Sequence, residues 1–135
     1  MRAWWYDTAG AADAVLATGE RDMPEPGTGE VRVRIARSAV NPTDTKRRAT
    51  GRELDSLGLI VPNNDGAGVI DAVGAGVDAA RVSRRVWIFG AQHARPHGTA
   101  AEFCTVPTDY AQPLPDALSM ADGACLGVPA VTAYA

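Results

Sequence analysis

The sequence predicts a mainly β protein, a small barrel or sandwich with few and short helices. Six or more short candidate strands are separated by residues that favour turns, which is typical of these two architectures. The centre of the chain holds a candidate strand, residues 67–73, with glycines at 66, 68, 74 and 76. Glycine in a strand marks a bulge, a tight bend or a close approach of backbones. We therefore expect a strongly bent strand in a small barrel.

The same glycines also invite comparison with a dinucleotide-binding fingerprint. That motif needs a strand before it, a helix after it, and a third glycine three residues beyond the second. After Gly68 that third position is Asp71, and after Gly76 it is Ala79. The residues after Gly68 are typical of a strand, so a phosphate-binding loop is not predicted here.

Length and composition indicate one ordinary globular domain. The chain has 135 residues, 13 basic and 16 acidic side chains and a net charge of −3, which gives no basis for binding nucleic acid. No apolar stretch is long enough for a membrane span or a signal peptide. The two cysteines make no disulfide framework, so a reduced, cytoplasmic environment is expected.

The N-terminal half begins with a short aromatic strand, residues 2–6, which residues 14–18 are expected to pair with. Residues 23–30 contain two prolines and two glycines, so they form a loop. Residues 31–35 alternate between aliphatic side chains and arginine, which predicts a half-buried strand.

A change of pattern follows at residues 39–48. Asn41 precedes a proline, which moves it out of helical geometry. Pro42 or Thr43 can then start a short helix, with Asp44 in its first turn and three basic residues at its end. Residues 49–60 have no clear period and are predicted to be an irregular connection.

The second half is predicted to alternate turns and strands. Residues 78–85 form a turn, 86–89 a buried strand, 90–98 a loop with both histidines, and 99–106 another strand. A short strand and a proline-bounded exit follow within 107–115.

The C-terminal segment is helical in character. Ser119 and Asp122 form a capping-box-like start, and Pro129 suits the first turn of a further helix. No charged side chain occurs from Gly123 onward. Such an apolar segment needs a cover, so we expect a further domain or a partner to pack against it. Residues 1–118 are interpreted as one domain, and residues 119–135 as the start of a helical connection to a second.

Six segments resemble stretches of the medium-chain dehydrogenases/reductases and stand in the same order. They are Asn41-Pro42-Thr43-Asp44, Asp65 to Gly74, Arg85-Val86-Trp87, Gly98 to Phe103, Pro113-Leu114-Pro115 and Ala124 to Tyr134. Together they cover essentially the whole chain, which is most similar to the zinc-free quinone oxidoreductase, or zeta-crystallin-like, branch.

The resemblance implies an N-terminal GroES-like domain, a partly open β-barrel. A Rossmann domain that binds NADPH normally follows in this family, and it would carry the phosphate loop and most of the NADP(H) site. By resemblance, Asn41 faces the nicotinamide and substrate, Asp44 orients the loop, and Thr132 contacts the cofactor. Lys46 is assigned to the cofactor site as well, although relatives often have an aromatic residue there. We expect a homo-oligomer, a dimer.

No zinc is expected. Zinc-dependent relatives have a ligand cysteine where this chain has Asn41, and a Gly-His-Glu where it has Asn64 and Asp65. The two histidines and two cysteines also lack the closely paired spacing of zinc sites.

The resulting hypothesis is the substrate-side domain of an NADPH-dependent quinone or enone reductase, inactive without its cofactor domain. Hydride transfer to a conjugated carbonyl needs only modest hydrogen-bond stabilisation of the developing oxyanion, and a neutral amide such as Asn41 supplies a donor. Two alternatives stay open: a stand-alone barrel that acts as a binding or assembly module, and a zinc-type alcohol dehydrogenase domain.

Overall fold

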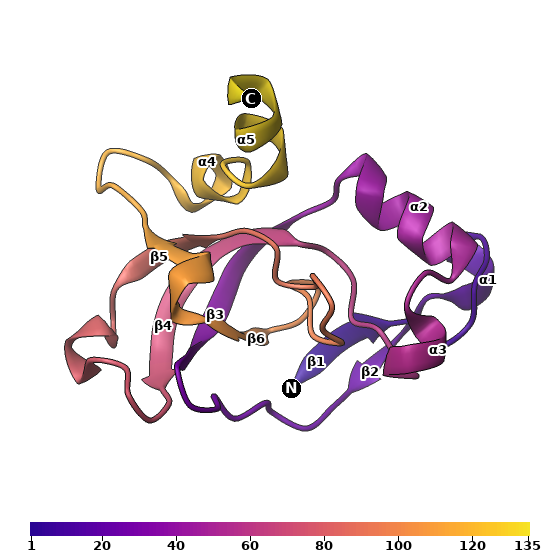
Figure 1. Cartoon of the computed structure of the whole chain (residues 1–135), viewed down its shortest axis with the longest axis horizontal. Coiled ribbons are helices and arrows are strands. Elements are labelled where there is room, and N and C mark those ends of the chain that lie inside the picture. Colours follow the sequence, from indigo (N-terminus) through magenta and orange to yellow (C-terminus); the bar gives the residue numbers. More distant parts are fainter.

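The computed structural model describes all residues, 1–135, and its centre is a curled five-stranded sheet (Figure 1). Every strand pair in this sheet is antiparallel, and the strand order is β6-β3-β4-β5-β7. The strands are β3 (Glu30–Ala39), β4 (Asp65–Val73), β5 (Arg85–Ile88), β6 (Phe103–Pro107) and β7 (Ala111–Pro113). The predicted mainly β, partly open barrel is confirmed, and the chain contains no parallel βαβ unit.

A two-stranded sheet of β1 (Arg2–Trp5) and β2 (Ala17–Glu20) lies beside the large one. Isolated bridges from Ala3 to Ala101 and from Tyr6 to Ile60 join it to the rest of the chain. The predicted pairing partner, residues 14–18, was placed too early. Its first residues belong to the single helical turn α1 (Ala12–Val15), where Asp13 lies in the favourable first turn.

The glycine-rich strand β4 is bent, as the sequence predicts. Its pairing with β3 shifts register twice, between Arg32 and Val33 and between Ile35 and Arg37. A Cβ atom at Gly68 would lie 2.1 Å from the carbonyl oxygen of Arg34. The glycine is therefore needed because two backbones approach closely at the bend.

The core lies inside the curl of the sheet and is aliphatic. The alternation in β3 is confirmed, because Val31 and Val33 are fully buried whereas Arg34 is exposed. Nine buried residues form the cluster: Val31, Val33, Ile70, Val86, Ile88, Ala91, Cys104, Val106 and Ala111.

Two sequence predictions need correction outside the core. The segment predicted to be irregular, residues 49–60, contains the short helix α3 (Leu54–Leu57). The strand predicted from residue 99 begins only at Phe103, because the amides of Thr99 and Ala100 donate instead to the carbonyls of Asn63 and Pro62.

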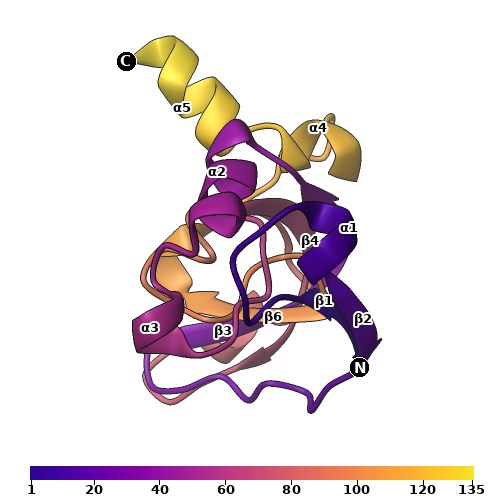
Figure 2. The ribbon, with the colours of Figure 1, turned by 90° about the vertical axis from the view of Figure 1, so that its right-hand side faces the viewer.

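The helices that matter for the site gather at one end of the curl. They are α2 (Pro42–Thr50), α4 (Met120–Ala124) and α5 (Val128–Tyr134), and two 3-10 turns, η1 (Ala79–Arg81) and η2 (Thr108–Tyr110), complete the fold. The predicted start at Ser119 is confirmed, since its hydroxyl accepts from the Asp122 amide at 3.1 Å. Helix α4 packs on β3, β4 and β5, and α5 extends away from the body with its first turn near α2 (Figure 2).

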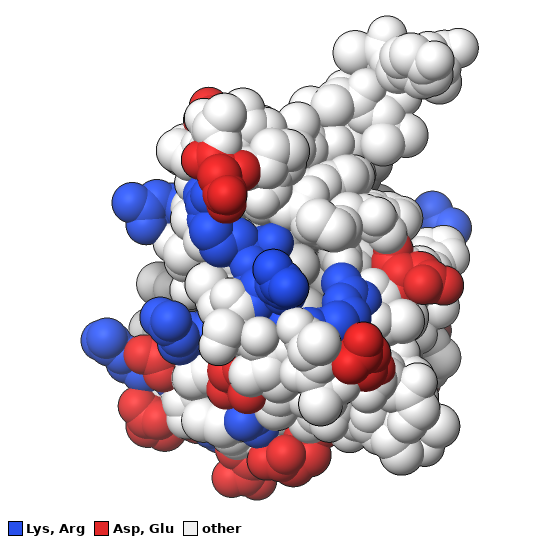
Figure 3. Space-filling model, turned by 90° about the vertical axis from the view of Figure 1, so that its left-hand side faces the viewer, with Lys and Arg blue, Asp and Glu red and all other residues white.

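Charge is distributed unevenly over the surface. Figure 3 shows basic side chains gathered across one face, whereas the C-terminal segment at the top of that view carries no charge. The turn from η1 to β5 contributes three arginines, and Arg85 lies 3.7 Å from Asp116. No helix is both long and apolar enough to cross a membrane.

Candidate functional site

The site begins at the N-terminus of α2. Asn41 has extended backbone angles and Pro42 occupies the first helical position, the arrangement expected before a proline. The Asp44 carboxylate accepts from the Asn41 backbone N–H at 2.8 Å. Both residues are 4% exposed. The local sequence thus fixes the loop and buries an amide and a carboxylate next to each other.

Asp44 also connects this loop to the segment that precedes β4. Its second oxygen accepts from Asn64 Nδ2 at 2.9 Å, and Asn64 Oδ1 accepts from the Gln92 N–H at 3.3 Å. Arg47 donates to the Gln92 carbonyl at 3.1 Å and to its side-chain oxygen at 2.5 Å. A continuous polar network therefore joins α2, the start of β4 and the loop after β5.

Asp65, the first residue of β4, extends the network towards α5. Its side chain is fully buried, and Oδ2 accepts from Asn41 Nδ2 at 2.8 Å and from the Val128 N–H at 2.7 Å. The other oxygen, Oδ1, has no hydrogen-bond partner. Burial raises the pKa of Asp65, the nearby Asp44 charge adds to this, and the two donors oppose it.

A cavity of about 410 Å³ opens beside this network. Phe89 and Tyr110 form a flat wall, with their rings stacked at a centroid distance of 5.0 Å. Ten residues from α2, the segment before β4, the loop after β5, η2 and α5 with the residue before it line the space: Thr43, Arg47, Asn64, Phe89, Gly90, His93, Tyr110, Gly127, Val128 and Val131. A planar, largely apolar ligand with one or two polar groups fits such a lining.

The predicted site residues fall into two groups. Asn41 and Asp44 share the buried network, and Lys46 on α2 and Thr132 on α5 are exposed. None of the four is among the residues that line the cavity. One proton of the Asn41 side-chain amide is donated to Asp65 Oδ2. The roles assigned to all four residues stay predictions.

Several residues of the buried network and of the cavity wall were not identified from the sequence. Asp65 was considered only as a replaced zinc ligand, and the aromatic wall was assigned simply to a buried strand and an exit loop. Phe89 and Tyr110, whose rings stack, are 21 positions apart in the sequence, so no local sequence pattern predicts this contact.

The two histidines and two cysteines do not form a metal-binding cluster. No three His, Cys, Asp or Glu side chains are grouped so that they could hold a metal ion. Cys104 is buried, and burial raises the pKa of its thiol to about 12, whereas Cys125 is exposed. His93 lies at the cavity, and the His97 carbonyl accepts from Cys104 Sγ at 3.3 Å.

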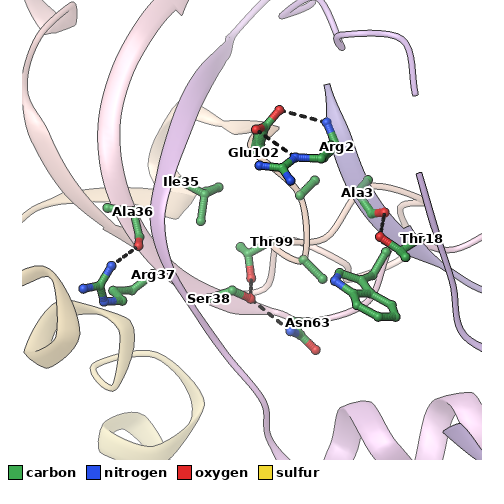
Figure 4. Close-up of a pocket in the computed structure, with 13 residues that line it drawn as sticks. Arg2, Ala3, Thr18, Ile35, Ala36, Arg37, Ser38, Asn63, Thr99 and Glu102 are labelled. Carbon is green, nitrogen blue, oxygen red and sulfur yellow. Dashed lines mark hydrogen bonds and ion pairs between the residues drawn. The ribbon is translucent and has the colours of Figure 1, made fainter. Parts of the chain in front are cut away.

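A second hollow, of about 580 Å³, lies between β1 and β3 (Figure 4). Its floor holds a chain of polar groups: Asn63 Nδ2 donates to Ser38 Oγ at 2.9 Å, and Ser38 Oγ lies 2.8 Å from Thr99 Oγ1. Thr99 Oγ1 in turn donates to the Asp65 carbonyl at 2.6 Å. Trp4, which is 50% exposed, lies at the rim.

With this geometry established, comparison with known proteins shows the family. Residues 27–116 match the model of the alcohol dehydrogenase GroES-like domain. The chain belongs to the alcohol dehydrogenase GroES-like domain family. Its predicted resemblance to the quinone oxidoreductases of the medium-chain dehydrogenases/reductases is thereby confirmed.

Individual members of the family give the same picture. Rat quinone oxidoreductase is 30% identical over 133 residues, covering 98% of this chain and 39% of the rat protein. The 2-methylene-furan-3-one reductase of tomato is 30% identical over 141 residues, covering 99% of this chain and 36% of that enzyme.

A mycobacterial protein whose structure was solved in complex with NADPH superposes with a TM-score of 0.86 at 28% identity, over 99% of this chain and 40% of the other. The chain thus spans about two fifths of the relatives it matches.

Proposed function

We propose that this chain is the substrate-side domain of an NADPH-dependent reductase of quinones or conjugated enones. The observation that carries the proposal is the aromatic-walled cavity beside the buried Asn41–Asp65–Asp44 network. The relatives named quinone oxidoreductase and 2-methylene-furan-3-one reductase support the same substrate class.

The cavity fits a nicotinamide ring with a planar acceptor beside it. Phe89 and Tyr110 offer a flat apolar surface, and the Thr43 hydroxyl, Arg47 and Asn64 bring donors to the same space. NADPH, when bound, supplies the hydride. The lining orients the acceptor and excludes water, and fixed donors stabilise the oxygen on which negative charge develops.

Within this proposal the four predicted residues have separate tasks. Asn41 donates the side-chain amide proton that Asp65 does not take to the nicotinamide or the substrate, and Asp44 holds the loop. Lys46 and Thr132, on the exposed faces of α2 and α5, contact the cofactor from outside the barrel. Residues 1–118 form the substrate-side domain and residues 119–135 begin the connection to a cofactor domain, which holds most of the NADP(H) site. The protein needs no zinc, acts in the cytoplasm and forms a dimer.

A chimera tests the proposal directly. This chain replaces the matching segment of rat quinone oxidoreductase, and NADPH oxidation is followed at 340 nm with 1,4-benzoquinone and with an unsaturated ketone. Turnover without added zinc, together with no turnover by the isolated chain, is expected. A folded chimera that binds NADPH yet reduces neither acceptor would refute the proposal.

A binding or assembly module is the second candidate, and one observation favours it. Helix α5 carries Val131 at 57% exposure and Tyr134 at 97%, with no charged residue nearby in sequence. If α5 is a contact between copies, light scattering of the isolated chain will give a dimer that Tyr134→Lys converts into a monomer. A monomer at all concentrations would exclude this second function.

A further inference from the structure

One carboxylate oxygen, Asp65 Oδ2, joins three segments that are far apart in the sequence. It accepts from the side-chain amide of Asn41, 24 residues earlier, and from the backbone N–H of Val128, 63 residues later. Asn41 precedes α2, and Val128 is the first residue of α5. These two helices both contribute residues to the cavity lining. The single oxygen therefore sets where two walls of the cavity begin.

The other oxygen, Asp65 Oδ1, explains why residue 127 is a glycine. A Cβ atom at Gly127 would lie 2.3 Å from Asp65 Oδ1 and 2.4 Å from its carboxyl carbon. The backbone of Gly127 has φ −69°, so left-handed geometry is not the reason for glycine. Its bare Cα allows the backbone to approach until the Val128 N–H reaches Oδ2. Glycine is thus needed for the approach of α5 to Asp65.

Stability alone does not account for this arrangement. Asp65 is fully buried and Oδ1 has no partner, so the fold bears the desolvation of a carboxylate with an unmatched oxygen. A neutral side chain of the same shape would hold a helix start at lower cost. A charged acceptor does, however, restrict the two donors to one geometry more strongly than a neutral one.

We propose that Asp65 is a positioning residue, whose Oδ2 holds the Asn41 amide and the start of α5 in one arrangement and so fixes the spacing of the cavity walls. The inference concerns the geometry of this chain; its catalytic meaning rests on the function proposed above.

Nuclear magnetic resonance of the isolated chain supplies two readouts. The first is the hydrogen-exchange rate of the Val128 N–H. The second is the chemical shift of the two Asn41 Nδ2 protons, which differ from each other when one is bound to a carboxylate. The variants are Asp65→Ala, Asp65→Asn and Gly127→Ala. Asp71→Asn is the matched control, because Asp71 lies on the same strand and pairs with Arg32 at 3.0 Å on the outer face.

In Asp65→Ala, exchange at Val128 is expected to accelerate about tenfold or more, the scale of one hydrogen bond to a charged group. The Asn41 protons should move towards the shifts of a free amide. Asp65→Asn, which keeps an oxygen acceptor, should restore part of both signals, and Asp71→Asn should change neither. Unchanged Val128 exchange in a folded Asp65→Ala protein would overturn the proposal.

Gly127→Ala keeps the test decisive if Asp65→Ala does not fold. The three heavy atoms nearest to the added methyl all belong to the Asp65 carboxylate, so a shift of the Asn41 protons is expected if Asp65 couples the two segments. A change confined to residues near 127 would overturn the proposal.

Failure of the positioning role and failure of the proposed function are separable. The resonance measurements need neither cofactor nor substrate, so they decide the positioning role alone. In the chimera, the same role predicts that Asp65→Asn lowers kcat more than it changes KM for benzoquinone. An inactive wild-type chimera would count only against the reductase function.

Discussion

Replacing Gly68 by alanine is expected to be among the most damaging single-methyl additions in the protein. The new Cβ would lie 2.1 Å from the carbonyl oxygen of Arg34 and 2.9 Å from Val33 Cγ1. To relieve only the first contact to 3.0 Å, β3 and β4 must separate by about 0.9 Å at the Ile35–Gly68 pair, next to a register shift. Neither obstacle is the flexible end of a long side chain, so the strain cannot be relieved by a rotamer change.

The expected cost is about 3 kcal/mol, the upper part of the range for overpacked cores. For a domain of this size, that corresponds to a fall in Tm of roughly 10 °C. Urea unfolding followed by circular dichroism gives the free energy of unfolding. Gly76→Asn is the matched control, because Gly76 has φ +80° and open space around it, and asparagine tolerates that conformation.

The control should cost less than about 1 kcal/mol, in line with the tolerance of asparagine for left-handed backbone. A Gly68→Ala protein as stable as the control would refute the claim that close backbone approach, and not turn geometry, requires glycine in β4.

Three further outcomes are expected. Burial raises the pKa of Asp65, so the folded chain binds that proton more tightly than the unfolded chain does. The free energy of unfolding should therefore fall as the pH rises from about 3.8 through the raised pKa. Urea unfolding at a series of pH values should show a smaller fall for Asp65→Asn than for the wild-type chain. Burial raises the pKa of Cys104 to about 12, so a thiol reagent should modify Cys125 alone in the native protein and both cysteines in urea, with Cys125→Ser abolishing the native reaction. Purified protein dialysed against zinc should retain well under one equivalent by atomic absorption, since no three candidate ligands are grouped; one tightly held equivalent would contradict this.

The sheet could be predicted from sequence because its signals are local. Alternation in residues 31–35 gives the buried face of β3, and the glycines around residue 68 give the bend of β4. The site is different, because Asp65 meets Asn41 and Val128 only through the tertiary fold. No spacing in the sequence reports that contact.

Errors in the local structure also have physical reasons. Residues 49–60 were predicted to be an irregular connection, yet the short helix α3 forms there after Glu53. Glu53 has left-handed backbone angles, which residue type alone does not reveal. Residues 99–102 have the pattern of a strand, but the amides of Thr99 and Ala100 donate to the segment 62–63, and the Glu102 amide donates to Arg2 of β1. The sequence pattern identifies residues that can form strand hydrogen bonds, and the tertiary fold determines which segment supplies their partners.

In the hydrogen-bond network on the floor of the second hollow, the donor and the acceptor of each bond can be assigned. Thr99 Oγ1 gives its only proton to the Asp65 carbonyl, so Ser38 must be the donor between the two hydroxyls. Ser38 Oγ then receives the Asn63 amide proton, and neither hydroxyl has a proton left to offer. Thr99 is fully buried, so Ser38 presents the hydroxyl that a molecule in the hollow can reach. Such a molecule meets an acceptor at Ser38 Oγ, and the one unused side-chain proton of this polar network is the second amide proton of Asn63.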